Sequence, residues 1–458
     1  MSLRVPVLVV ALTLLGGGAF AQIGDVFNRP GSGARAAGMA NAFIAVSDDG
    51  TAASWNPAGL GQLRKPELSL VSSSIGRSID VEGFRTRDDL GVFTPAHSSY
   101  QSTYLDFASL AVPVSLWGKP VTFQGSWRRL YALDYREIVS TTLTPLTPDG
   151  PPPVQFDRNH DLAGSVNILS LAAAIRLSRR VIVGASFNVW RGDWTEDAAS
   201  SGTLLEAPGG NAFLTTSQAN RVRGENLSVG LMLTYPRWSV GVVHQAPLHS
   251  DFDASARIIS SVSPDVGTQS ASGTLQFPRS FGLGGAWRPA ERWTVALDLT
   301  RDQWTEAILD TPETGRVNFL DGLPPERSSS RDTTTISAGA EHLFFGGGYV
   351  IPLRFGAAWE PQGARNPYTR DPVNFTMLAL GTGYNTNSLK FDAALQYRWA
   401  QFQTGADFGL LEPQPELPMA IGEQQSREWR LKFSLILRIT DTDKLHRTLG
   451  KIFGGGSS

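Results

Sequence analysis

Hydrophobic and polar residues alternate along much of the chain, most regularly over residues 389–399 and 429–439. In the first stretch the odd positions are Leu389, Phe391, Ala393, Leu395, Tyr397 and Trp399, and the even positions are Lys390, Asp392, Ala394, Gln396 and Arg398. A period of two residues places all the apolar side chains on one face of a strand. Aromatic residues cluster at the ends of these stretches, where the girdles of a membrane barrel lie. The pattern predicts β-strands with one apolar face.

Strands of a water-soluble sandwich also alternate, so the lengths of the connections decide between the two architectures. Short turns, such as those at 178–180 and 346–348, alternate with long polar segments at 140–161, 193–221 and 306–331. An even number of strands with short turns at one end and long loops at the other is typical of outer-membrane barrels. We therefore predict an all-β fold, a transmembrane antiparallel barrel of about fourteen strands over residues 64–441.

The composition narrows the function. Lys and Arg number 40 against 42 Asp and Glu, so the net charge of −2 gives no reason to expect a nucleic-acid partner. There is no Cys, which excludes disulfides, thiol chemistry and Cys-based zinc sites. Charged residues make up 18% of the chain, below the roughly 25% of an ordinary globular domain.

The first residues have the features of a secretory signal peptide. MSLR is followed by an apolar stretch from Val5 to about Leu15 and then by Ala19-Phe20-Ala21, a small-residue cleavage pattern. The apolar stretch is shorter than the roughly 20 residues that span a bilayer as a helix. We expect residues 1–21 to be removed on export to the outer membrane of a Gram-negative-type bacterium.

The next segment, residues 22–63, does not alternate and is rich in Gly and Ala. A barrel of about fourteen strands encloses a lumen wide enough to leak unless something fills it. Small residues allow a backbone to pack closely against a wall. We predict that this segment is a plug in the lumen, and that residues 442–458 form a C-terminal tail after the last strand.

The plug sequence resembles a known family. Residues 33–40 (GARAAGMA), 42–49 (AFIAVSDD) and 55–60 (WNPAGL) are similar to the opening of the outer-membrane long-chain fatty acid transporters, which include FadL and its aromatic-hydrocarbon relative TodX. The resemblance implies a plugged barrel of fourteen strands. It also implies capture of a hydrophobic ligand from outside and lateral release through a gap at a kink in the third strand. Carried over by position, Asn56, Pro57 and Ala58 are the gating candidates.

The expected third strand offers two further candidates, Gly125 and Arg129. Val121, Phe123, Trp127, Tyr131 and Leu133 share its lipid-facing parity, and Arg129 is the charged exception. One interpretation is a kink at Gly125 with Arg129 beside a lateral opening. The other is an ordinary barrel glycine and an arginine at the outer interface, where its cost falls to roughly 0–1 kcal/mol.

Lumen-facing parity is shared by several arginines, of which Arg354, Arg398 and Arg430 are candidate contacts for a ligand head group. An arginine can hold a carboxylate with two parallel hydrogen bonds. Alternatively, these side chains bond to the plug and to lumen carboxylates, and the pattern does not choose one arginine as the binding site.

Catalytic and metal chemistry have little support in the sequence. The chain has six His, and no signature surrounds its Ser residues that would place a nucleophile beside a base. His160-Asp161 and the Asp251, Asp253 pair match no metal-ligand spacing. We expect no enzyme activity, no cofactor and no bound metal.

The sequence therefore predicts a monomeric outer-membrane barrel, surrounded by lipid, that moves hydrophobic small molecules inward. Long-chain fatty acids are the first expectation and aromatic hydrocarbons the second. Apolar residues of external loops, such as Phe213-Leu214, would capture the ligand, which would pass along the plug and leave sideways. A structural or partner-binding barrel associated with secretion, and less so an outer-membrane hydrolase, are the alternatives.

Overall fold

The structure, a computed structural model, describes residues 31–86, 91–116, 118–146, 148, 153–205, 211–261, 268–365, 370–406 and 420–439. The expected signal peptide (1–21) and C-terminal tail (442–458) lie outside the described residues. No helix in the described ranges is long and apolar enough to cross a membrane.

The described part of the chain is built mainly of strands. Their bounds are β1 Glu67–Thr86, β2 Gly91–Phe93, β3 Ala96–Leu116, β4 Lys119–Ala132, β5 Tyr135–Pro145, β6 Val154–Arg176, β7 Val181–Leu204, β8 Asn211–Thr234, β9 Trp238–Gln245, β10 Leu248–Ser260, β11 Thr268–Phe277, β12 Ser280–Trp287, β13 Trp293–Asp302, β14 Ile308–Thr311, β15 Gly315–Asn318, β16 Thr333–Phe345, β17 Val350–Arg365, β18 Pro372–Asn385, β19 Leu389–Ala406 and β20 Ala420–Arg438.

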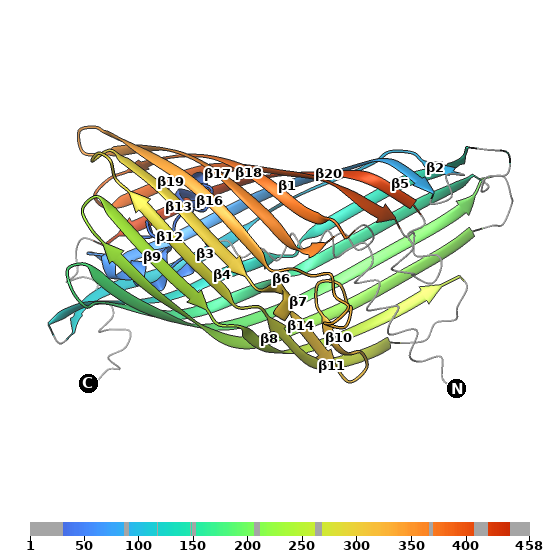
Figure 1. The fold of residues 1–458 in the computed structure, drawn as a ribbon, viewed down its shortest axis with the longest axis horizontal. Coiled ribbons are helices and arrows are strands. Elements are labelled where there is room, and N and C mark those ends of the chain that lie inside the picture. The colour runs from blue at the N-terminus through green and yellow to red at the C-terminus, as the bar shows by residue number, and fades with distance from the viewer. Residues whose placement is uncertain are drawn as a thin grey trace, which may run out of the picture.

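These strands form one antiparallel sheet that closes on itself, because β1 pairs with β20 from Glu67 opposite Arg438 up to Thr86 opposite Ala420 (Figure 1). Three positions in the wall hold two strands end to end, namely β4 with β5, β9 with β10, and β11 with β12. Counted this way, the described residues make a barrel of 14 strand positions. The predicted all-β barrel is confirmed.

One end of the barrel has short turns, as expected. The prediction of long loops at the other end is largely wrong, because most of those segments are strands. Most of residues 140–161 and 193–221 belong to β5, β6, β7 and β8, which pair almost to their tips. The segment 306–331 contains the β14–β15 hairpin, which attaches to β11. A polar segment is expected to contact water, but it need not be a loop. A strand that extends beyond the membrane is in contact with water as well.

The outward face carries an apolar band. Alternate side chains of neighbouring strands point outward and are exposed, for example Leu171 (72%), Leu380 (54%) and Leu395 (46%). Tyr397 and Trp399 lie at one end of the band and Tyr384 and Phe391 at the other. The inward partners in β19, Lys390, Asp392, Gln396 and Arg398, are buried, as the alternation predicts. An apolar band between aromatic girdles is the architecture of outer-membrane barrels.

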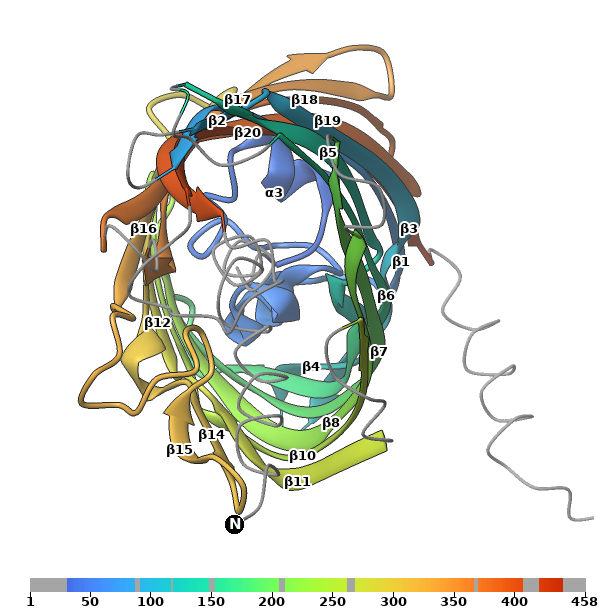
Figure 2. The same cartoon turned by 90° about the vertical axis from the view of Figure 1, so that its right-hand side faces the viewer.

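Residues 31–63, here called the plug segment, lie inside the barrel, and Figure 2 shows the helix α3 (Ala34–Gly38) enclosed by the strands. Two 3-10 helices follow, η1 (Ala52–Ser54) and η2 (Pro57–Gln62). The wall has glycines at many of the places where the plug segment approaches it most closely. A Cβ would meet plug atoms within 3 Å at Gly184, Gly230, Gly241, Gly284, Gly339, Gly356 and Gly381. Close packing against small residues of the wall explains why the segment fits.

Candidate functional site: an apolar cluster beside an interrupted seam

An apolar cluster fills part of the lumen, although membrane-barrel interiors are usually polar. Its buried members are Leu130, Tyr131, Leu133, Leu162, Val166, Ile168, Trp190, Val222, Leu248, Phe252, Leu275, Phe277, Trp304, Ala307, Leu309, Val317, Leu320 and Ala364. We call this set the lumen apolar cluster. It joins the inner faces of β6, β7, β8, β10 and β11 to the segment 304–320, which contains η3 (Trp304–Glu306) and the β14–β15 hairpin.

Aromatic rings dominate the centre of the cluster. Phe277 stacks against Trp190 at 5.9 Å and against Tyr131 at 6.4 Å between ring centroids, and Phe319 tilts against it at 5.8 Å. The Trp190 indole N–H donates to Asn226 Oδ1 at 3.1 Å, so the buried ring satisfies its polar group. Such a surface can hold an apolar guest by contact and ring stacking.

The barrel wall is interrupted next to this cluster, at the third strand position. β4 ends at Ala132 and β5 begins at Tyr135. β4 pairs with β3 only as far as Phe107 opposite Arg128, and no described strand pairs with residues 96–106 of β3 on that side. Higher up, β2 spans the interval by pairing with both β1 and β5. Gly164, opposite the break, has φ +138°, a conformation that favours glycine.

Side chains close this interval. Tyr100 of β3 meets Tyr135 of β5 edge to face at 4.9 Å. Below them the Arg129 guanidinium lies 5.4 Å from the Tyr104 ring centre and its Nη1 lies 4.0 Å from Asp134 Oδ2. We call Tyr100, Tyr104, Arg129 and Tyr135 the seam residues. Tyr135 also packs against the lumen apolar cluster, so seam and cluster are in contact.

The seam begins at the outer edge of the apolar band. Arg129 is opposite Asn167 of β6, and two residues nearer the membrane centre β6 presents the exposed side chain of Leu169. On the other side of the seam, Leu105 of β3 is also exposed. An opening here would join the lumen to the lipid rather than to water alone.

The Asn56-Pro57-Ala58 turn holds the plug segment against β8. The Asn56 side chain is fully buried, accepts from the Ala58 N–H at 3.0 Å and donates to the carbonyls of Ile44 and Leu231, each at 3.3 Å. A cavity of about 110 Å³ lies between plug and wall, with Pro57 on its lining together with Arg128, the neighbour of Arg129. The turn therefore borders a space that extends toward the seam.

An ionic network ties the plug segment to the opposite wall. Arg35 donates to both carboxylate oxygens of Glu341, at 3.0 and 3.1 Å, and pairs with Asp48. Glu341 also accepts from Arg354 at 2.7 Å, and Arg354 donates to Asp392 at 2.8 Å. Burial by itself would raise the pKa of Asp48, but the charge and hydrogen bond of Arg35 together with the charge of Lys390 outweigh it and hold that pKa below its ordinary value.

A second group of charges lies higher in the lumen, around Glu428. It accepts from Arg77 at 3.0 Å and from Arg430 at 2.5 Å, and Arg398 Nη1 lies 3.5 Å from it. Arg398 also lies 3.3 Å from Glu360 and covers the Phe375 ring at 4.1 Å. Three arginines thus surround one carboxylate.

No protein-family model and no curated protein sequence matches the chain. Solved structures do match it. A Pseudomonas aeruginosa FadL homologue superimposes with a TM-score of 0.64 at 14% identity, covering 89% of this chain and 98% of that one. The toluene transporters TodX of P. putida and TbuX of Ralstonia pickettii give TM-scores of 0.57 and 0.55, each at 15% identity and covering 90% of this chain and 99% and 100% of theirs. The chain has the FadL-type fold.

Within this FadL-type barrel the two candidate residues of the third strand, Gly125 and Arg129, have different outcomes. Gly125 stands in an unbroken ladder, opposite Leu110 and Leu171, and a Cβ there would meet nothing within 4 Å. Of the two interpretations of Gly125, the kink is therefore wrong and the ordinary barrel glycine agrees with the structure, since the wall is interrupted at Leu133 and Asp134 instead. Arg129 does lie at the interruption. Tyr131 and Leu133, expected to face lipid, are buried in the lumen apolar cluster, because a register shift between Arg129 and Tyr131 reverses the faces.

The three arginine candidates lie in two different groups of charges. Arg354 is fully buried within the network that anchors the plug segment, whereas Arg398 and Arg430 lie in the group around Glu428. A head-group role remains a proposal for the latter two. In the described part of the chain no three His, Asp or Glu side chains gather as they would to hold a metal ion.

The lumen apolar cluster and the seam tyrosines were not predicted from the sequence. One usable signal was present in β6, where the run Ile168 to Ile175 is apolar at nearly every position instead of alternating. Another is the apolar content of the expected polar segment 306–331, which includes Ile308, Leu309 and Phe319. Both indicate strands or hairpins with apolar contacts on the inner side.

Breaking the network at Arg35 is expected to loosen the plug segment. In Arg35→Met the Glu341 carboxylate keeps one arginine and loses the other, and removing one partner of a buried pair costs about 3 kcal/mol. A cysteine placed at the fully buried Ala42 should then react with maleimide about 100-fold faster. Arg64→Met, at an exposed arginine next to the segment, is the matched control. Equal labelling rates in both variants would show that the network does not hold the plug.

Proposed function

We propose that this protein carries hydrophobic small molecules across the outer membrane, long-chain fatty acids first and monoaromatic hydrocarbons second. The observation that supports it is the lumen apolar cluster, which lies in contact with the interrupted seam of the wall. A barrel that served only as a rigid support would have no need of buried apolar side chains in its lumen. The FadL-type fold, which it shares with toluene transporters, agrees with this function.

The proposed route has three steps. A ligand enters from the outer end, where the segment 304–320 covers the cluster. It then replaces contacts among the aromatic rings around Phe277, since apolar burial favours any guest that fits. Finally it leaves between β3 and β5 when the seam residues part, and Asn56, Pro57 and Ala58 gate the space below by holding or releasing the plug segment. Diffusion down a gradient needs no cofactor, and one chain supplies the whole route.

Phe213 and Leu214, the residues expected to capture ligand in an external loop, belong to the outer part of β8 instead. Phe213 is exposed, so initial contact with a ligand there stays part of the proposal. The segment 304–320 is the better candidate for the entrance, because it contributes Trp304, Leu309 and Leu320 to the cluster.

Ligand binding can be read from Trp190, which is fully buried in the cluster. In purified protein, dibrominated stearate and bromotoluene are expected to quench tryptophan fluorescence, and Trp190→Phe should remove a saturable part of that quenching. Trp238→Phe, at an exposed outward position, is the matched control. Quenching that is linear in ligand and unchanged in Trp190→Phe would mean that the cluster takes no ligand.

Transport itself is tested by uptake of labelled oleate and of toluene in cells with and without the protein. Equal uptake in both would overturn the proposal and favour a structural or partner-binding barrel. Arg430→Met in the same assay separates the two ligand classes, because an arginine that meets a carboxylate should matter for oleate and not for toluene.

A further inference from the structure

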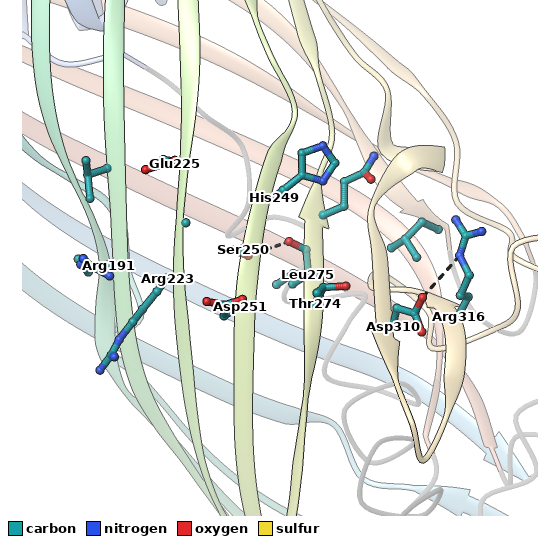
Figure 3. Close-up of a pocket in the computed structure, with 14 residues that line it drawn as sticks. Arg191, Arg223, Glu225, His249, Ser250, Asp251, Thr274, Leu275, Asp310 and Arg316 are labelled. Atoms are coloured by element: carbon teal, nitrogen blue, oxygen red, sulfur yellow. Dashed lines mark hydrogen bonds and ion pairs between the residues drawn. The ribbon is translucent and has the colours of Figure 1, made fainter.

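The outer wall of the barrel has a second hollow, on the side away from the lumen. Its volume is about 590 Å³, and it is lined by outward side chains of β7, β8, β10 and β11 and of the β14–β15 hairpin (Figure 3). Register places most of the lining in two rows. The upper row runs Arg191, Arg223, Asp251, Thr274, Asp310, and the lower row runs Val189, Glu225, His249, Gln276, Ile308.

The hollow lies directly above the apolar band. On β7 the exposed side chain of Phe187 lies four residues nearer the membrane centre than Arg191, with Val189 between them. On β8 the exposed side chains of Leu227, Val229 and Leu231 follow Glu225 in the same direction. A lipid whose acyl chains lie along this apolar stripe would bring its head group to the level of the hollow.

Two arginines face each other without an acceptor. Arg191 and Arg223 are register partners on adjacent strands, both are exposed, and like charges directly opposite destabilise a sheet. Neither side chain makes a hydrogen bond or ion pair with any residue that the structure describes, even though Asp251 is the register partner of Arg223 on its other side. Figure 3 shows Arg191 and Arg223 together at one side of the hollow. An anion between them would remove the repulsion.

The neighbouring arginines behave differently. Arg221, two residues along β8 on the same face, donates to Asp193 at 2.8 Å, and Arg316 lies 4.0 Å from Asp310 across the hairpin. On this face, therefore, arginines that lie near a carboxylate do form ion pairs with it. Among the outward arginines of β7, β8 and the β14–β15 hairpin that the structure describes, Arg191 and Arg223 are the two without a partner.

The rest of the hollow is suited to hydroxyl groups rather than to a second anion. Thr274, Gln276 and His249 can each donate or accept, and the carboxylates of Glu225 and Asp251 can only accept from hydroxyl groups when ionised. A phosphate at one side and a saccharide over the remainder would match both parts.

We infer that this hollow binds the phosphorylated saccharide head group of an outer-leaflet glycolipid, with the phosphate between Arg191 and Arg223. Two guanidinium groups supply fork-shaped donors that fit phosphate oxygens. The acyl chains lie below against the apolar band. The site does not depend on transport, and it fixes one side of the barrel to the lipid around it.

The inference is tested on the full-length protein in detergent, with native mass spectrometry to count bound lipid. A phosphorylated glycolipid is expected to bind about tenfold tighter or more than the same lipid after phosphatase treatment. The double variant Arg191→Gln, Arg223→Gln should reduce its affinity to that of the dephosphorylated lipid. Arg221→Gln, the matched arginine that already has a partner, should leave the affinity unchanged.

Inorganic phosphate distinguishes a free anion from a head group. If phosphate at the same concentration does not displace the glycolipid, the saccharide and acyl contacts contribute and the inference stands. If phosphate displaces it fully, the hollow is a simple anion site and the inference fails. It fails too if the dephosphorylated lipid binds as tightly, or if Arg221→Gln weakens binding as much as the double variant.

Discussion

Replacing Gly284 with valine is expected to unseat the plug segment and open the lumen to water-soluble molecules. A Cβ on Gly284 would lie 2.5 Å from Asp298 Oδ1, 2.8 Å from Ile44 Cβ and 2.9 Å from the Ala45 nitrogen. Asp298 accepts from the N–H groups of Phe43 and Ile44 at 2.6 and 2.7 Å, so the new side chain would also displace this carboxylate. Overpacking together with two lost hydrogen bonds to a buried carboxyl group costs about 4 kcal/mol.

The adjacent glycine supplies the control. Gly285 belongs to the same strand but faces outward, and a Cβ there would meet nothing within 4 Å. Gly285→Val therefore makes the same chemical change without touching the plug segment. Single-channel conductance in planar bilayers should be large and lasting for Gly284→Val and near zero for Gly285→Val. Heat-modifiable gel migration checks that both barrels fold. If the two conductances are equal, the plug segment does not depend on the glycine-lined wall.

The alternation of side chains predicted the wall of the barrel well because the rule is local. The inner and outer faces of β19 follow from the period of two residues. The short turns predicted at 178–180 and 346–348 are followed within two residues by the strand starts at Val181 and Val350. Lipid outside and a polar interior impose the same alternation on each strand. The resemblance carried by residues 33–60 then accounted for the segment inside.

The candidate site was less predictable, for two physical reasons. A single extra residue near Leu130 reverses the faces of the third strand, so Tyr131 and Leu133 moved from the expected lipid side to the lumen. Sequence patterns do not show such a bulge, because each side of it alternates normally. The seam also depends on which segments do not pair. Residues 96–106 of β3 pair with β1, but no described strand pairs with them on their other side, because β5 pairs with β2 and β6 instead, and the sequence of β3 does not reveal this.

Joining β3 to β5 across the seam is expected to stop lateral release. Tyr100 and Tyr135 contact each other across the interval, and the chain has no cysteine of its own. The double variant Tyr100→Cys, Tyr135→Cys can therefore be bridged by a short bis-thiosulfonate that reductant later removes. We expect uptake of labelled oleate and toluene to fall to the level of cells without the protein after bridging and to return after reduction.

A second pair of cysteines shows whether bridging itself is harmful. Leu110 and Gly125 are register partners in the paired part of the same two strand positions, and both point outward, so bridging them joins strands that are already hydrogen-bonded. Uptake should be unchanged in Leu110→Cys, Gly125→Cys. If bridging at Tyr100 and Tyr135 leaves uptake intact, the ligand does not leave between β3 and β5. The contact between the lumen apolar cluster and the seam would then serve only packing, and the cavity beside Pro57 would become the better candidate for the exit.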